Sequence, residues 1–286
     1  MTFAKLQATG NDFVVIDARH LKKQWASLAR QICHRHFGVG ADGLILVMPS
    51  KTAEVKMRMF NPDGSEAEVC GNGLRCLAKY VFEKGLVRGR EFRVETQAGI
   101  KTVRVAVYRK KVKRVKVNMG TPAFAPEDIP VSRDSKNFGN SRLDITPIID
   151  YPLKVDDVEL SVSLVSLGNP HAVMFTTEPV SRFPLALIGP KVESHPLFPE
   201  RINFEIARVL DERTIEVRVW ERGAGETLSC GSGACAVATI ARHKRLVDKP
   251  VDIILPGGKL SVTWAESGEV LINGPVEEIF IGQWLK

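Results

Sequence analysis

The sequence predicts an α+β fold of two similar halves, each with many antiparallel strands and a few helices. Two observations predict it. Residues 55–73 can be placed over residues 215–233 without a gap, and both segments have the pattern of a strand, a loop and a helix. Elsewhere, segments that alternate apolar with polar residues outnumber helical patterns, and they indicate half-buried strands. Many strands with separate helices are typical of the α+β class.

The repeated unit begins with a predicted strand. Residues 55–60 and 215–220 alternate apolar with charged side chains, and each segment ends in an aromatic residue, Phe60 or Trp220. Successive side chains of a strand point to opposite faces, so this alternation buries one face and exposes the other. We therefore expect matching strands in the two halves.

Each predicted strand leads into a loop that closes on Cys-Gly-x-Gly, at residues 70–73 and 230–233. Apolar helical patterns follow over 74–82 and 234–241. A weaker similarity between the halves lies upstream, where Asn11 and Asn169 each follow a glycine between strand-like segments. Two unrelated units could resemble one another by chance. The ungapped match of the cysteine and both glycines favours a duplication.

The boundary between the halves is expected near residues 120–122, before a proline-rich stretch. This division gives an N-terminal half, 1–118, with the first cysteine, and a C-terminal half, 119–275, with the second. We expect a helix near residues 23–36 and an exposed loop over residues 133–146.

Composition narrows the function class. Of the 286 residues, 44% are hydrophobic and 26% are charged, which argues against a disordered or fibrous chain. The formal net charge is +7. The densest basic run, residues 109–116, continues an alternating valine pattern without interleaved aromatics. It predicts a hairpin with a solvated face, not a nucleic-acid surface. We expect no nucleic-acid partner, and a positive surface would help to gather an anionic small-molecule substrate.

No leader or membrane-spanning run is recognisable, so we expect a cytoplasmic protein without a membrane partner. The five cysteines are an odd number, which does not suggest a disulfide scaffold. They form no Cys-x-x-Cys pair, and no histidine motif typical of zinc sites is present. We therefore expect neither a metal nor another cofactor.

Each Cys-Gly-x-Gly lies where a loop becomes a helix. The glycines let a ligand approach the backbone, and the first-turn N–H groups bind anions and stabilise a thiolate. If two such units met in a cleft between the halves, their sulfurs would flank one substrate carbon beside a bound carboxylate. Cys70 and Cys230 could then remove a proton from one face and return one to the other. Cys33, Cys76 and Cys235 fall in or near apolar helical patterns, which predicts core positions.

Five segments together resemble the diaminopimelate epimerase family, in order and over essentially the whole chain. They are residues 10–13, 61–66, 70–76, 168–171 and 221–233. The resemblance implies cofactor-independent conversion of LL- to meso-diaminopimelate, in lysine and peptidoglycan precursor biosynthesis, by a homodimer. It also implies that each half wraps strands around a central helix, and that the C-terminal strand near 276–286 returns to the first half.

The resemblance also implies roles for particular residues. Cys70 and Cys230 would be the acid and base, and His171 and Glu221 would modulate their pKa values. The residues expected to bind substrate are Asn11, Asn61, Gly71, Asn72, Asn169, Asn203, Glu221, Arg222, Gly231 and Ser232. Among them, Gly71, Asn72, Gly231 and Ser232 would hold the reacting carboxylate.

Two of these assignments have simpler alternatives. From its position alone His171 could be an ordinary loop histidine, and Glu221 with Arg222 could be a surface ion pair. The chain also departs from the family pattern. Gly43 stands where some members have a glutamine that contacts substrate, and residues 7–11 lack the usual His-Gly start.

Other functions stay open at this point. A different two-cysteine racemase, such as a proline racemase, would share the cysteines but typically has a histidine where Asn72 stands. A dithiol redox protein would need a functional disulfide. A noncatalytic binding module would be marked by the loss of either cysteine, and both are present.

Overall fold

The computed structural model describes residues 1–67, 70–132 and 146–285. The chain forms two compact units. The first comprises Met1–Asn118 and Asn273–Lys286, and the second comprises Met119–Ile272. Residues 133–145 of the loop expected at 133–146 lie outside the described residues.

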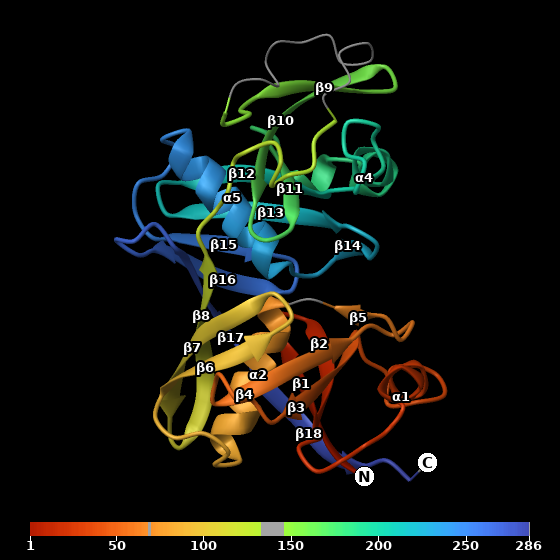
Figure 1. Cartoon of the computed structure of the whole chain (residues 1–286). Helices are drawn as coiled ribbons and strands as arrows, with labels where there is room; N and C mark the ends of the chain where they lie inside the picture. The colour runs from red at the N-terminus through yellow and green to blue at the C-terminus, as the bar shows by residue number, and fades with distance from the viewer. Residues whose placement is uncertain (68–69, 133–145, 286) are drawn as a thin grey trace. The chain divides into compact units, whose positions relative to one another are not determined.

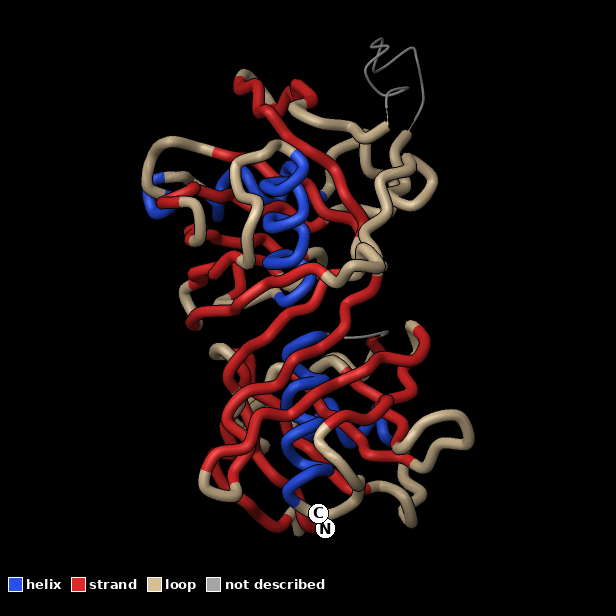
Figure 2. The backbone as a smooth tube through the Cα atoms, turned by 90° about the vertical axis from the view of Figure 1, so that its left-hand side faces the viewer, coloured by secondary structure: helices blue, strands red, loops and turns tan. Residues whose placement is uncertain are grey.

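In the first unit, strands surround the helix α2 (Figures 1 and 2). Its helices are α1 (Trp25–Ile32) and α2 (Gly71–Glu83). Its strands are β1 (Thr2–Ala8), β2 (Asn11–Asp17), β3 (Gly43–Met48), β4 (Val55–Phe60), β5 (Glu66–Ala67), β6 (Glu91–Thr96), β7 (Gly99–Tyr108) and β18 (Glu277–Gln283), together with β8 (Lys111–Gly120), which continues into the second unit at Met119. Strand β18 pairs antiparallel with β1, and the Met1 amino group donates to the Trp284 carbonyl at 2.8 Å.

The second unit has the same plan around the helix α5. Its helical elements are η2 (Val180–Arg182), α4 (Leu185–Glu193) and α5 (Gly231–His243). Its strands are β9 (Tyr151–Val155), β10 (Val158–Ser166), β11 (Pro170–Phe175), β12 (Asn203–Asp211), β13 (Thr214–Glu221), β14 (Gly225–Thr227), β15 (Val251–Leu255) and β16 (Gly258–Trp264). The last strand, β17 (Val270–Pro275), begins in this unit and continues into the first at Asn273.

Strand pairing repeats between the units. In the first, β1–β2, β3–β4, β4–β5 and β6–β7 are antiparallel, while β2–β3 and β4–β6 are parallel. In the second, β10–β11, β12–β13, β13–β14 and β15–β16 are antiparallel, while β11–β12 and β13–β15 are parallel. The predicted α+β fold of two similar halves is therefore confirmed.

The parallel pairs are the part of the topology that the sequence patterns did not predict. Each joins two strands separated in the chain by a helix: α1, α2, α4 or α5. A parallel neighbour needs a crossover connection, which a helix usually provides, whereas a short turn returns the chain antiparallel. Each helix crossover therefore accounts for one parallel pair.

The two central helices are buried on nearly all sides. In α2, Leu74, Leu77 and Val81 have no exposed surface, and Val237 and Ile240 of α5 are equally enclosed. The polar side chains Arg75 and Lys79 of α2 are buried as well, so the cover extends beyond its apolar face. The wrapping of strands around a central helix, implied by the family resemblance, is confirmed in each unit.

Three local predictions can be compared with the structure. Residues 109–116 lie in the predicted hairpin, formed by β7 and β8. The helix expected over 23–36 is shorter and ends at Ile32, because Val39 and Gly40 donate to the Ile32 carbonyl and fold the chain back. The three cysteines predicted for the core, Cys33, Cys76 and Cys235, are buried.

None of the described helices is long and apolar enough to span a membrane.

Candidate active site

The two repeated cysteines occupy the same place in their units. Cys70 is the N-cap of α2, with φ −139° and ψ 120°, and Cys230 is the N-cap of α5, with φ −117° and ψ 120°. Each sulfur accepts from the backbone N–H three residues on, at 3.4 Å from Gly73 and 3.3 Å from Gly233. Both sulfurs therefore lie at a helix N-terminus, where the helix dipole favours negative charge.

The last glycine of each motif permits close packing of the helix on a strand. A Cβ atom on Gly73 would lie 3.0 Å from Met57 Cε and 3.1 Å from Ile45 Cδ1. A Cβ on Gly233 would lie 2.7 Å from Glu205 Oε1. The methionine tip can move aside, whereas the Glu205 carboxyl group is fully buried.

We expect Gly233→Ala to lower the free energy of unfolding by about 2 kcal/mol, as overpacking does, and Gly73→Ala to cost less. Urea unfolding of the two variants would measure the difference through their midpoints. Equal midpoints would contradict the tight fit of α5 against Glu205.

In the first unit, three predicted site residues lie together. Asn11 begins β2, and its Oδ1 accepts from Asn72 Nδ2 at 3.3 Å and from Cys70 Sγ at 3.7 Å. Asn72 is buried in the first turn of α2 beside Gly71. The structure thus places a carboxamide against the Cys70 sulfur.

Asn61 and Gly43 lie in the same unit but do not join this group through hydrogen bonds within the described residues. Asn61 Nδ2 donates to Ser65 Oγ at 3.0 Å and braces the turn after β4. Gly43 begins β3, where a Cβ would lie 3.1 Å from the Phe60 carbonyl oxygen. A side chain at position 43 therefore requires its neighbours to shift.

In the second unit, hydrogen bonds link five residues in a row. His171 Nδ1 lies 2.7 Å from Glu205 Oε1, and His171 Nε2 lies 3.1 Å from Asn169 Oδ1. Asn169 Nδ2 donates to Ser232 Oγ at 3.3 Å, and that oxygen lies 3.4 Å from Cys230 Sγ. His171 is therefore not an ordinary loop residue: it is fully buried and connected to the cysteine loop.

Glu205 is the residue that sequence reasoning missed. It is fully buried on β12, and its Oε2 has no hydrogen-bond partner among the residues that the structure describes. Its only sequence signal is a charge inside the apolar run 204–207. A charged side chain is rarely buried without a polar partner, so a glutamate inside an apolar run predicts that such a partner exists.

The charges around Cys230 oppose its ionisation. Burial raises the pKa of the Cys230 thiol well above its usual value, and the carboxyl groups of Glu221 and Glu205 raise it further. Hydrogen bonds from Ser232 and from the Gly233 N–H act in the other direction. Burial also raises the pKa of Glu221, against hydrogen bonds from Thr227 and Cys230. These surroundings favour the thiol form of Cys230.

A charge-removing variant tests this balance. Glu221→Gln removes a negative charge beside the sulfur, so the pKa of Cys230 should fall and more thiolate should be present at a given pH. We expect faster alkylation of Cys230 by iodoacetamide in the substrate-free protein, followed by peptide mass spectrometry. Glu226→Gln is the matched control, because Glu226 pairs with Arg218 instead. Equal rates in both variants would contradict the effect assigned to Glu221.

Asn203 and Arg222 brace the loop that precedes β14. Asn203 Nδ2 donates to the Pro170 carbonyl at 2.8 Å, and its Oδ1 accepts from the Arg222 N–H at 3.0 Å. The exposed Arg222 side chain donates to the Glu200 carbonyl at 3.1 Å. No ion pair joins Glu221 to Arg222 in the described part of the chain, so the alternative of a surface ion pair is wrong.

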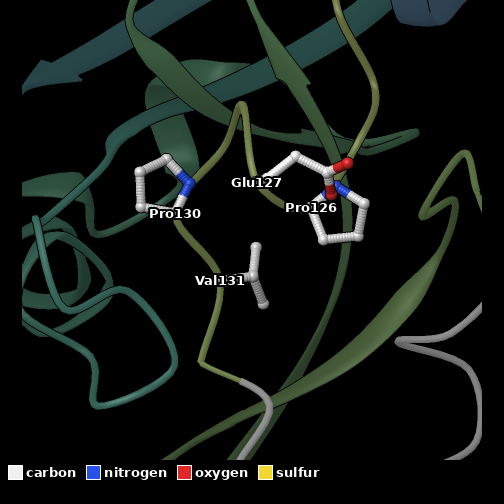
Figure 3. A pocket seen from close by; sticks show the side chains of 4 residues that line it. All are labelled: Pro126, Glu127, Pro130 and Val131. Carbon is white, nitrogen blue, oxygen red and sulfur yellow. The ribbon is translucent and has the colours of Figure 1, made fainter.

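A cavity in the second unit contains none of the predicted site residues (Figure 3). It has a volume of about 420 Å³ and is lined by Pro126, Glu127, Pro130 and Val131. One carboxyl group with two prolines offers neither a thiol nor a general acid–base pair. Across residues 1–67, 70–132 and 146–285, no three His, Cys, Asp or Glu side chains are grouped to hold a metal.

Solved structures resemble this fold at low sequence identity. A phenazine biosynthesis protein of the PhzF family from Bacillus anthracis covers 100% of this chain and 99% of its own, with a TM-score of 0.69 and 19% identity. A probable proline racemase from Agrobacterium radiobacter covers 100% of this chain and 93% of its own, with a TM-score of 0.70 and 15% identity. At these identities the likeness concerns the fold alone.

Sequence relatives are much closer. The chain is 45% identical to the diaminopimelate epimerase of Acetivibrio thermocellus over 285 residues, 99% of this chain and 98% of the relative. It is 44% identical to that of Moorella thermoacetica over 287 residues, 99% of both chains. The family model for diaminopimelate epimerase matches residues 3–125 and 163–278, which contain both N-cap cysteines. The chain belongs to the diaminopimelate epimerase family, a family of isomerases.

Proposed function

We propose that this protein interconverts LL- and meso-diaminopimelate without a cofactor, with Cys70 and Cys230 as the two acid–base groups. The reaction would serve lysine and peptidoglycan precursor biosynthesis. The observation that carries the proposal is the repeated thiol N-cap: two cysteines in one conformation, each at the start of a buried 13-residue helix. Relatives at 41–45% identity over nearly the whole chain bear the name of this enzyme.

In the proposed mechanism one sulfur acts as a thiolate and the other as a thiol. The thiolate takes the proton of the substrate α-carbon, so a C–H bond breaks and an S–H bond forms. The thiol then gives its proton to the opposite face of the carbanion, and the second sulfur becomes the thiolate. Atoms and charge balance within the pair, whose protons must be counted together. The mechanism requires both sulfurs to reach the same carbon from opposite sides.

The carbanion is the difficult intermediate. We propose that the first-turn N–H groups of α2 and α5, at Gly71, Asn72, Gly231 and Ser232, stabilise the charge that spreads onto the α-carboxylate. Exclusion of water from a closed site would strengthen this stabilisation.

The remaining polar residues would hold the other groups of the substrate. These residues are Asn11, Asn61, Asn169, Asn203, Glu221 and Arg222. Glu221 suits an ammonium group and Arg222 a carboxylate, and pairs of this kind form strong hydrogen bonds. The homodimer implied by the family resemblance also stays a prediction, which light scattering coupled to size-exclusion chromatography would test.

Isotope exchange tests the function directly. The protein is incubated with LL-diaminopimelate in deuterated water without added cofactor, and the product is analysed by mass spectrometry and chiral chromatography. We expect meso-diaminopimelate with deuterium at the inverted carbon. Parallel incubation with L-proline tests the proline racemase alternative. Inversion of proline but not of diaminopimelate would overturn the proposal, and so would a product without deuterium.

A further inference from the structure

Four charged residues of the first unit form a network that the proposed mechanism does not use. We call Lys5, Asp12, Arg35 and Asp42 the Asp42 cluster. Arg35 Nη2 lies 3.0 Å from Asp12 Oδ1 and 2.5 Å from Asp42 Oδ1, and Lys5 Nζ lies 2.5 Å from Asp12 Oδ2. Arg35 is mostly exposed, and exposed ion pairs contribute little stability. The contacts of Asp42 therefore suggest another use for the cluster.

Asp42 fixes the orientation of the Asn11 carboxamide. Its Oδ2 accepts from Asn11 Nδ2 at 2.6 Å and from the Asp12 N–H at 3.0 Å. An ionised carboxylate only accepts hydrogen bonds, so the amide nitrogen of Asn11 must be the atom that faces Asp42. The carbonyl oxygen of Asn11 then faces Asn72 and Cys70, as the distances above record.

The parallel pairing of β2 with β3 places Asp42 beside Asn11. Phe13 lies opposite Gly43 in this register, and the Asp42 N–H donates to the Asp12 carbonyl at 2.8 Å. Asp42 is thus held by the backbone at the end of the sheet where Asn11 begins β2.

The second unit orients its equivalent asparagine the other way. There His171 lies opposite Asn203, so Asn169 corresponds to Asn11 and Ile202 corresponds to Asp42. With an apolar residue in that place, Asn169 turns its oxygen to His171 Nε2 and its NH₂ group to Ser232. One cysteine loop therefore faces a carbonyl acceptor and the other faces an amide donor.

We propose that Asp42 is a positioning residue that keeps the Asn11 carbonyl oxygen aimed at the Cys70 sulfur. The inference rests on the proposed function for its catalytic meaning. A carbonyl oxygen accepts the S–H of a thiol and repels a thiolate, whereas an amide N–H would do the reverse. With Asp42 in place, the Asn11 oxygen opposes ionisation of Cys70, while the helix dipole favours it. Without it, the Asn11 amide is free to turn its NH₂ group toward the sulfur.

Asp42 can act on the ionisation of Cys70 in two ways, through its negative charge and through the orientation of Asn11. Among the residues that the structure describes, the charged groups near Asn11 include the Asp42 cluster, and Arg75 of α2 donates from Nη2 to Thr9 Oγ1 at 2.9 Å. Removing the charge of Asp42 would itself favour a thiolate at Cys70. The test therefore needs a variant that loses the charge and keeps the acceptor, and a background without the Asn11 amide.

The experiment measures the pH dependence of iodoacetamide alkylation of Cys70 in the substrate-free full-length protein, by peptide mass spectrometry. Asp42→Ile introduces an apolar residue of the kind that Ile202 supplies in the second unit. We expect it to lower the midpoint, the pH at which the alkylation rate of Cys70 reaches half its maximum, by about 0.5 to 1 pH unit. A shift of this size corresponds to the free energy of about one hydrogen bond. Asp42→Asn should lower the midpoint by less, because it loses the charge but its amide oxygen still accepts from Asn11.

A double-mutant cycle completes the test. In an Asn11→Ala background, Asp42→Ile should shift the midpoint no more than Asp42→Asn does. Equal shifts in Asp42→Ile and Asp42→Asn, persisting in that background, would show a charge effect and overturn the proposal. No shift in Asp42→Ile would also overturn it.

Controls separate this result from misfolding and from the proposed function. The alkylation profile of Cys230 in the same digests should be unchanged in Asp42→Ile. The variant Asp17→Ile, which removes a strand-end aspartate paired with Arg19, should leave the Cys70 profile unchanged. Asp42→Leu replaces Asp42→Ile if the latter does not fold. The assay contains no substrate, so its outcome is independent of the isotope-exchange test of the reaction.

Discussion

Replacing either Cys70 or Cys230 by alanine should lower kcat for diaminopimelate epimerisation by at least about a thousandfold, within the range that a general acid or base contributes. Each direction of the reaction needs one sulfur to take a proton and the other to return one. Loss of either group therefore blocks both directions. Initial rates for both epimers, followed by chiral chromatography, would measure the effect.

The matched controls are Cys76→Ala and Cys235→Ala. These cysteines lie on the same helices, α2 and α5, and are fully buried in their cores. Burial raises the pKa of Cys76, so it is not poised to act as a base. We expect both controls to lose some stability and to keep their rates. A single alanine variant at Cys70 or Cys230 with more than a few per cent of wild-type activity would contradict the two-base mechanism.

The repeated unit was predictable from sequence because its information is local. A strand, a loop and a helix that follow one another need no distant partner to be recognised, and an offset of 160 residues aligned Cys70 with Cys230. The N-cap geometry follows from the same short segment. The chemistry could therefore be inferred before the topology was known.

The partners of the cysteines were not predictable from these patterns because they depend on strand register. His171 meets Glu205 only because β11 and β12 are parallel, with His171 opposite Asn203. Asp42 meets Asn11 through the equivalent pairing in the first unit. Period-two patterns predict a strand but not its neighbour or direction, so residues that contact across a parallel pair are hidden from them.

The buried pair His171–Glu205 offers a second large effect, because the first unit contains an apolar version of it. By strand register, Phe13 corresponds to His171 and Ile45 corresponds to Glu205, and both are fully buried. Glu205→Ile alone leaves His171 Nδ1 buried without its partner. We expect a loss of about 3 kcal/mol in the free energy of unfolding, as for other broken buried polar pairs.

The double variant His171→Phe/Glu205→Ile should recover most of that stability. A buried polar pair replaced by apolar residues of similar volume is often neutral or stabilising, whereas breaking the pair is costly. Urea unfolding of both single variants and the double variant would give the coupling energy. Additive losses would contradict a coupled pair.

Activity should not follow stability in this series. The double variant removes the contact between His171 Nε2 and Asn169 Oδ1. The series of contacts from Asn169 through Ser232 to Cys230 is then no longer held by a buried histidine. We expect a well-folded protein whose kcat falls at least about a hundredfold, the lower range for a disturbed general acid or base. The reciprocal double variant Phe13→His/Ile45→Glu places the polar pair in the first unit. We expect it to lower the free energy of unfolding and to bring no increase in kcat. A stable and fully active double variant would show that the buried pair serves the fold and not the cysteine.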